Sequence, residues 1–310
     1  MSRHYCNFLA VAALAVGVSC DALASGTASG TASGTASGTA SGTTSIRVDP
    51  PRARPGDALV VTVPGLPPSD AAGLSGTASG RPLRFYPTPA GAQAITALPI
   101  ELPPGTVTIE VRLPGRPEPL LASVEIVDPG FPETKLSVAP KFIAPSPEQK
   151  KRMEEDQAAF REAFGRPFEP PLFSGTFGRP RDAAVTGRYG ERRTFNGQKQ
   201  SQHYGTDLAG AVGDPVQATN DGLVVLARDC FASGKSIAVS HGGGLFSVYF
   251  HLSELDVRPG DRVRRGQPIG KVGQTGRVTG PHLHFGVKVG DLYVDPESVY
   301  RIAFSLPAPP

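Results

Sequence analysis

The stretch that decides the fold is residues 281–289, which read Pro-His-Leu-His-Phe-Gly-Val-Lys-Val. Such a short run, with apolar residues at alternate positions, predicts a β-strand over 282–289. Successive side chains of a strand point to opposite faces of its sheet, so His282 and His284 share one face while Leu283 points into the core. The sequence therefore predicts a strand that presents two imidazoles side by side.

Similar short apolar runs precede this strand, at 222–227, 236–240, 246–250 and 267–272. The chain has 310 residues, of which 37 are Gly and 32 are Pro. So many turn-forming residues favour short strands and exclude a helical bundle or a coiled coil. The fold class is therefore mainly β, and the length suits about two domains.

Residues 45–145 are expected to form the first of these domains. Apolar runs at 59–63, 107–111 and 123–127 alternate with outward-facing polar residues and are separated by Pro and Gly turns. Strands at this spacing are typical of a small immunoglobulin-like β-sandwich.

A linking helix is predicted at 146–165. Ser146 can cap it, Pro147 suits its first position, and Gln149 can close a capping box with Ser146. The second β domain is expected at 171–302, followed by a Pro-rich tail at 303–310.

The first 44 residues carry targeting and spacer signals. A basic start, an apolar stretch and a small-residue cleavage site predict a signal peptide at 1–24. Residues 25–44 repeat Ser-Gly-Thr-Ala and predict a flexible tether, and we interpret a copy of this repeat at 75–80 as a loop tip. An alternative interpretation makes Cys20 a lipidated N-terminus. Both interpretations predict an exported protein of the periplasm or cell envelope.

Charge and hydropathy exclude several partners. The net charge of +3 is too small to indicate nucleic acid. No apolar run approaches the roughly 20 residues of a membrane span, so the mature chain is expected to have none. Of the three cysteines only Cys230 lies outside the signal region, so no internal disulfide is expected.

Histidine is the informative residue type, because apart from His4 every histidine lies between 203 and 284. A catalytic zinc site needs three protein ligands and an open fourth position. His203 and Asp207 can supply two ligands from one segment, and one histidine of the 282/284 pair can supply the third. The other is then available for acid–base chemistry. His241 stands before three glycines, and we assign it a structural role.

At this point the sequence resembles a known family. Residues from about 172 to 300 resemble the M23 peptidases, the lysostaphin-type zinc endopeptidases that cut peptidoglycan cross-links. The resemblance rests on these motifs: His203-x-x-x-Asp207, Ser240-His241-Gly242, His251-Leu252-Ser253, Pro259-Gly260-Asp261-x-Val263-x-x-Gly266-Gln267-x-Ile269-Gly270, Gly273-x-Thr275-Gly276 and His282-Leu283-His284. The N-terminal region is similar to the immunoglobulin-like domain of some exported members.

The resemblance implies an antiparallel sheet with a groove above one zinc ion per chain. It implies His203, Asp207 and His284 as zinc ligands, and His251 and His282 as catalytic residues. The implied reaction is hydrolysis of the peptide cross-links of peptidoglycan, with one catalytic histidine accepting the proton of the attacking water. The division of roles between these two histidines, and the bond that is cut, stay open.

Three other functions remain as alternatives. An inactive M23-like module would bind the wall or activate an amidase, but such relatives lose zinc ligands, whereas all five positions stand here. A lipoyl- or biotin-carrier-like module over 259–276 would need a modifiable lysine flanked by Met, which Lys271 lacks. A wall-adhesion module would hold no metal. Zinc content separates the enzyme from these alternatives.

Overall fold

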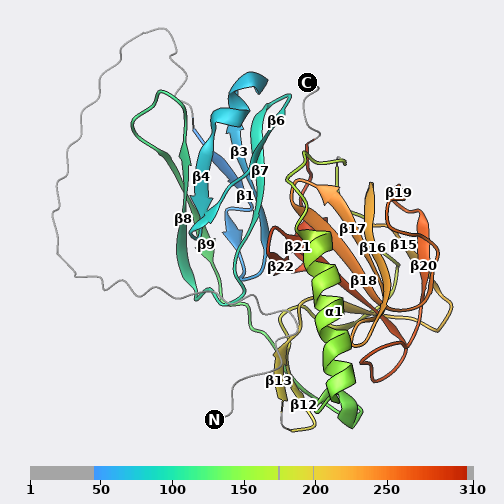
Figure 1. Ribbon diagram of the computed structural model, residues 1–310. Helices are drawn as coiled ribbons and strands as arrows, with labels where there is room; N and C mark the ends of the chain where they lie inside the picture. Colours follow the sequence, from blue (N-terminus) through green and yellow to red (C-terminus); the bar gives the residue numbers. More distant parts are fainter. Residues whose placement is uncertain (1–44, 174, 198, 306–310) are drawn as a thin grey trace, which may run out of the picture. The chain divides into compact units, whose positions relative to one another are not determined.

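The computed structural model describes residues 45–305 except 174 and 198 (Figure 1). The predicted signal peptide with Cys20, the whole predicted tether at 25–44, and residues 306–310 of the predicted tail lie outside the described residues. No helix in the described part of the chain is both long and apolar enough to cross a membrane. The fold is mainly β, as predicted.

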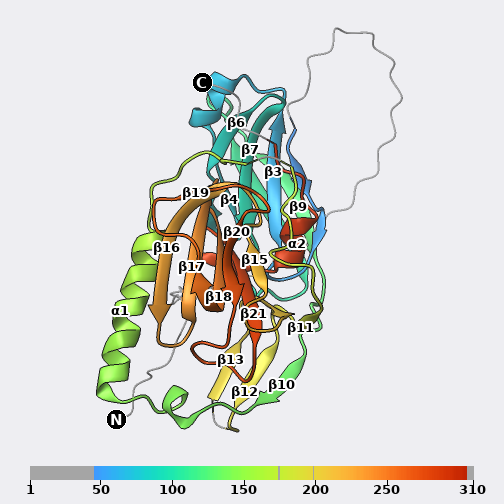
Figure 2. The same ribbon diagram turned by 90° about the vertical axis from the view of Figure 1, so that its right-hand side faces the viewer.

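Two sheets form a sandwich in the N-terminal part of the described chain (Figures 1 and 2). One sheet has the order β1 (Arg47–Asp49), β3 (Ala58–Pro64), β7 (Gly91–Ala97) and β6 (Phe85–Thr88). The other has the order β2 (Arg52–Ala53), β9 (Leu120–Ile126), β8 (Gly105–Arg112), β4 (Ser75–Ala78) and β5 (Arg81–Pro82). Leu59 and Val61 from the first sheet join Ile109 and Val111 from the second in one buried core. The immunoglobulin-like topology stays a prediction.

The repeat copy at 75–80 is not only a loop tip, and this corrects the sequence interpretation. Ser75–Ala78 forms strand β4, which pairs with β8 so that Ala78 lies opposite Ile109. Only Ser79 and Gly80 form the turn that leads to β5. This copy forms a strand because Ala78 is fully buried in the sandwich core. The repeat sequence alone contains too little apolar surface to predict such burial.

Helix α1 (Pro147–Phe164) begins as the sequence predicts. The Ser146 hydroxyl accepts a hydrogen bond from the Gln149 N–H, and the Gln149 side chain accepts one from the Ser146 N–H. The C-terminal turns pack on the large sheet described next: Phe160 lies 5.7 Å from Phe250, and Phe164 lies 5.2 Å from Phe246, between ring centroids. Helix α1 therefore covers part of one face of that sheet (Figure 1).

The large sheet has ten strands in the described chain, and every pairing in it is antiparallel. Its main order is β11 (Val185–Gly187), β14 (Thr206–Ala209), β21 (His282–Val289), β18 (Leu245–Leu255), β17 (Gly234–Gly242), β16 (Gly222–Cys230) and β19 (Arg262–Val263). At its margins lie β15 (Pro215–Gln217), β20 (Pro268–Val272) and β22 (Leu292–Val294), which precedes helix α2 (Pro296–Tyr300).

The register of this sheet places one residue from each of three strands side by side. In the pairing of β14 with β21, Asp207 lies opposite His284, and in the pairing of β18 with β21, Phe250 lies opposite the same histidine. Leu283 is fully buried in the core on the other face, as the alternation predicts.

A small three-stranded sheet was not predicted. Strand β10 (Glu133–Leu136) pairs in parallel with β12 (Arg192–Phe195), which pairs with β13 (Lys199–Gln202). Figure 2 shows these strands together below the large sheet. The segment that follows the last sandwich strand therefore runs alongside residues that lie just before His203.

Candidate metal centre

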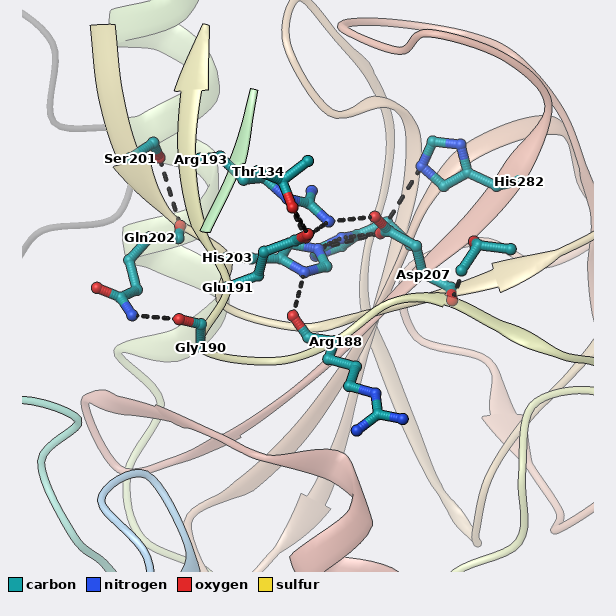
Figure 3. A network of polar contacts seen from close by, with 12 residues as sticks. Thr134, Arg188, Gly190, Glu191, Arg193, Ser201, Gln202, His203, Asp207 and His282 are labelled. Atoms are coloured by element: carbon teal, nitrogen blue, oxygen red, sulfur yellow. Dashed lines mark hydrogen bonds and ion pairs between the residues drawn. The ribbon is translucent and has the colours of Figure 1, made fainter. Parts of the chain in front are cut away.

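Three ligand atoms converge at the point where β14 meets β21. His203 Nε2 lies 3.0 Å from His284 Nδ1, and the Asp207 Oδ1 atom lies 3.1 Å from the first and 2.9 Å from the second. Within the described residues, these three form a group of His, Cys, Asp or Glu side chains whose ligand atoms all lie within 4.8 Å of one another. The structure thus brings together the three residues that the family resemblance implies as zinc ligands. Figure 3 shows two of them, His203 and Asp207, side by side.

Local geometry explains this convergence. Asp207 lies in β14 directly opposite His284, and His203 lies on the approach to that strand. Gly205 leaves room for the third partner, because a Cβ at this position would lie 2.7 Å from the His284 ring. Phe250 stacks on that ring at a centroid distance of 5.3 Å and an interplanar angle of 8°.

The state of these side chains suits metal binding. The His203 Nδ1 lies 2.7 Å from the Arg188 carbonyl oxygen, which accepts the Nδ1 proton and leaves the lone pair on Nε2. Burial lowers the pKa of His284 to about 4, so its imidazole is neutral near pH 7. Burial alone would raise the pKa of Asp207, but the adjacent His203 and His284 hold it well below its usual range. The set therefore offers the Nε2 of His203, the neutral imidazole of His284 and the Asp207 carboxylate.

The donor set fits zinc. Two imidazole nitrogens and one carboxylate oxygen are zinc ligands, whereas calcium prefers oxygen alone. With bonds of about 2.0 Å, the ligand atoms of a tetrahedral zinc lie about 3.3 Å apart. The separations here of 2.9, 3.0 and 3.1 Å are close to that spacing.

The two histidines predicted to be catalytic lie next to this group. Their rings are 5.1 Å apart between centroids. The His251 Nδ1 lies 2.9 Å from the Thr275 carbonyl oxygen, and the His282 Nδ1 lies 2.9 Å from the Gly280 carbonyl oxygen. Each carbonyl accepts an Nδ1 proton, so Nε2 is the nitrogen of each ring that is available to exchange a proton.

Their surroundings differ. Burial, together with the nearby His284 and His282, lowers the pKa of His251 well below its ordinary value of 6.5. The His282 side chain is 17% exposed, and its Nε2 lies 3.7 Å from the Asp207 Oδ1.

An irregular backbone turns His251 toward the site. Its φ is 66°, in the left-handed region that a residue other than Gly seldom adopts. Tyr249 and Leu252 both lie in the core on one face of the sheet, while Phe250 and His251 both approach the His284 ring. A regular strand would place His251 on the opposite face from Phe250, so this conformation is what makes His251 available.

The remaining sequence candidates lie apart from the ligands. His241 is fully buried, with Nδ1 2.7 Å from the Asp221 carbonyl oxygen and Nε2 2.8 Å from the Ser247 hydroxyl. This agrees with the structural role assigned to it. Cys230 is a free and buried cysteine, and burial raises its pKa to about 11.

The sequence did not identify the residues that form hydrogen bonds to the candidate ligands His203 and Asp207. Arg188 and Glu191 contact His203 through their backbone carbonyl groups, and Arg193 contacts Asp207 through its side chain. No spacing pattern links these positions to a metal site, because their contacts depend on how β12 is placed.

Comparisons with known proteins agree with this geometry. A profile of peptidase family M23 matches residues 201–296. The crystal structure of a Pseudomonas aeruginosa protein described as peptidase M23 is 30% identical, with a match that covers 79% of this chain and 94% of that protein, at a TM-score of 0.59. The chain belongs to peptidase family M23. The resemblance of residues from about 172 to 300 to this family is thereby confirmed. The carrier-like interpretation of 259–276, which lies inside the matched range, is wrong.

Curated relatives of this M23 chain match over shorter stretches. Peptidoglycan DD-endopeptidase ShyA of Vibrio cholerae is 44% identical over 88 residues, which is 28% of this chain and 20% of ShyA. DD-carboxypeptidase/endopeptidase Mpg of Neisseria meningitidis is 38% identical over 107 residues, 34% of this chain and 24% of Mpg. The chain therefore spans about a fifth to a quarter of the length of the curated relatives it matches.

Proposed function

We propose that this M23 peptidase is a zinc-dependent endopeptidase that hydrolyses the peptide cross-links of peptidoglycan. The observation that carries the proposal is the convergence of His203, Asp207 and His284, with His251 and His282 beside them. Relatives that match this segment include peptidoglycan DD-endopeptidases and a glycyl-glycine endopeptidase, ALE-1 of Staphylococcus capitis, 45% identical over 85 residues that make up 27% of this chain and 24% of ALE-1.

In this proposal, His203, Asp207 and His284 hold one zinc ion. When bound, zinc supplies Lewis acidity toward the scissile carbonyl and toward a water molecule. The protein's own task is then to move protons. His251 is neutral because burial lowers its pKa, and its Nε2 accepts the proton of the attacking water. His282, which is more exposed, stabilises the oxyanion or protonates the leaving amine.

The proposal extends to the cellular setting. We propose that residues 1–24 direct export and that the protein acts in the periplasm or cell envelope, with peptidoglycan as its partner. Lipid attachment at Cys20 is the alternative to a freely diffusing mature chain. The domain limits predicted from sequence, including 171–302 for the peptidase part, remain part of this proposal.

The experiment measures metal and products together. We expect the purified protein to carry about one equivalent of zinc and to convert cross-linked dimeric muropeptides to monomers, identified by mass. A pentaglycine peptide assayed in parallel distinguishes a DD cross-link from a glycine bridge. A zinc-loaded protein that cleaves neither substrate would contradict the proposal and favour the alternative of an inactive wall-binding or amidase-activating module.

A further inference from the structure

Residues 188–193 form a bracket behind two of the three candidate ligands. The Arg188 carbonyl oxygen accepts the Nδ1 proton of His203, 2.7 Å away, and the Glu191 carbonyl oxygen accepts the His203 N–H at 2.9 Å. The Arg193 guanidinium donates to the Oδ2 atom of Asp207 at 2.8 Å. This bracket precedes the range that the family profile matches.

Arg193 is held from its other side. Its Nε donates to the Glu191 carboxylate at 2.7 Å, and the second oxygen of that carboxylate accepts a hydrogen bond from the Thr134 hydroxyl (Figure 3). The Arg193, Glu191 and Asp207 side chains are between 11% and 14% exposed, so these bonds are largely shielded from water. Charge-assisted bonds in such surroundings fix geometry more firmly than exposed ion pairs do.

Thr134 belongs to a different part of the chain. It lies in β10, in register with Arg193 of the parallel strand β12, and β10 follows the last strand of the sandwich. A continuous line of polar contacts therefore runs from Thr134 through Glu191 and Arg193 to Asp207.

The charges of Arg193 and Glu191 are compatible with a metal ion bound at Asp207. A lone guanidinium next to a metal ligand would repel the metal. Glu191 offsets the charge of Arg193, so the pair orients Asp207 without adding net positive charge at the site. Gly187 leaves space for the contact, because a Cβ there would lie 2.4 Å from the Arg193 guanidinium and 2.6 Å from the Asp207 carboxylate.

We propose that Arg193 is a positioning residue for the metal. It holds Oδ2 of Asp207, so that Oδ1 is the one oxygen directed at His203 and His284, and Glu191 with Thr134 holds Arg193 in place. This inference rests on the proposed function, because it presupposes a metal at these ligands.

The expected effect is on metal affinity. Without Arg193 the Asp207 carboxylate is free to rotate, and both its oxygens can reach the metal. Loss of a residue that orients a metal ligand typically weakens metal binding about 10–100-fold. We expect that range for Arg193→Met, and a smaller loss for Thr134→Val, which removes only the outermost hydrogen bond. Arg193→Lys keeps the positive charge and should therefore recover part of the zinc affinity. The recovery should be incomplete, because one ammonium group cannot donate to both carboxylates as the guanidinium does.

The experiment uses the full chain and measures zinc affinity by competition with a chromophoric chelator. Cobalt provides the second measurement, because four-coordinate Co²⁺ absorbs visible light more strongly than five-coordinate Co²⁺. We expect weaker absorption per cobalt in Arg193→Met, since Asp207 can then contribute both oxygens. Melting of the metal-free proteins serves as the control for folding.

Two matched variants isolate the effect. Arg192→Met changes the adjacent residue of the same strand, whose side chain is 64% exposed and lies 3.8 Å from Glu133, and it should leave zinc affinity and the cobalt spectrum unchanged. The double variant Glu191→Gln/Arg193→Met removes the carboxylate that Arg193→Met would leave unpaired, and it should still bind zinc more weakly than the parent.

The outcomes are distinguishable. If the parent binds zinc while Arg193→Met and the double variant bind it within about twofold of the parent, with an unchanged cobalt spectrum, the inference is wrong although the proposed function stands. If the parent binds no zinc, both fail. Should metal-free Arg193→Met melt well below the parent, Thr134→Val decides, and an unchanged zinc affinity there would overturn the inference.

Discussion

Two histidines of the large sheet, His241 and His284, have similarly low pKa values but differ in their partners. Burial lowers the pKa of His241 to about 4, and it does the same to His284. Both nitrogens of His241 have partners on this chain, the Asp221 carbonyl and the Ser247 hydroxyl. At the other site, the Nε2 of His203 and the Nδ1 of His284 face each other and the Asp207 Oδ1.

The comparison teaches that burial alone does not distinguish a structural histidine from a metal ligand. What distinguishes them is whether both ring nitrogens already have hydrogen-bond partners within the chain. The Ser247 hydroxyl, which bonds His241, also donates a hydrogen bond to the Tyr249 hydroxyl. The Tyr249 hydroxyl in turn contacts Thr219, so His241 belongs to a network in which its partners are neutral groups of this chain. Nitrogen atoms that face one another with lone pairs are unfavourable neighbours unless a cation or a proton lies between them. Four predictions test this distinction.

The largest effect is expected from Asp207→Ala. The variant loses a charged ligand and leaves the Arg193 guanidinium beside two imidazoles, so we expect loss of bound zinc and of muropeptide hydrolysis. Because metal binding contributes to folding free energy, the purified variant should melt below the zinc-loaded parent. Metal analysis and calorimetry measure both. The control is Asp229→Ala, an aspartate whose side chain is 63% exposed. One equivalent of zinc in Asp207→Ala would show that the ligand assignment is wrong.

Next comes His251→Asn, which keeps a residue that tolerates positive φ. If His251 moves a proton and does not bind metal, zinc content should stay at the level of the parent. Removing a general base typically costs about 10²–10⁴-fold in rate, and kcat on dimeric muropeptides should fall by that amount. Full activity would transfer the role to His282, whereas loss of zinc would make His251 a ligand.

The pH dependence of stability gives the third test. His241 has a folded pKa of about 4 against an ordinary value of 6.5, so the unfolded chain takes up its proton first as the solution is acidified. Its contribution to stability is therefore present above pH 6.5 and lost as the pH falls toward 4, by at most about 3 kcal/mol. Urea unfolding of the metal-free parent and of His241→Gln should show a smaller loss over this window in the variant. Equal slopes would mean that His241 does not titrate as its burial requires.

The smallest effect is expected from Ser247→Ala. It removes a hydroxyl that bonds His241 and Tyr249, and we expect the free energy of unfolding to fall by about 1–2 kcal/mol. Zinc affinity should not change, since this network lies apart from the ligands. A variant that lost zinc would join the two histidine groups into one functional unit and remove the contrast between them.

Much of the site was predictable because it depends on local periodicity. Strand alternation correctly placed Leu283 in the core and His282 and His284 on one face. The capping residues of α1 were also readable, because a capping box is formed within four consecutive positions. The family motifs added the third strand, which carries His251.

The rest depends on long-range pairing, which no local pattern encodes. The pairing of β10 with β12 joins positions 59 residues apart, and it determines where Arg193 lies. The left-handed backbone of His251 departs from regular strand geometry, so alternation alone would have turned this side chain away from the metal site. Strand β4 was missed because its repeat sequence gains a buried position only when β8 lies beside it.

The two glycines that line the site bear on whether it could be rebuilt elsewhere. A designer who transplanted only the five chemically active side chains to another antiparallel sheet would fill the space next to them with Cβ atoms. At Gly205 such an atom would press against the ring of a ligand, and at Gly187 against the ion pair that supports another. A transplanted site would therefore need more than its five reactive side chains. It would also need glycine at two positions next to them, which leave space that any other side chain would fill.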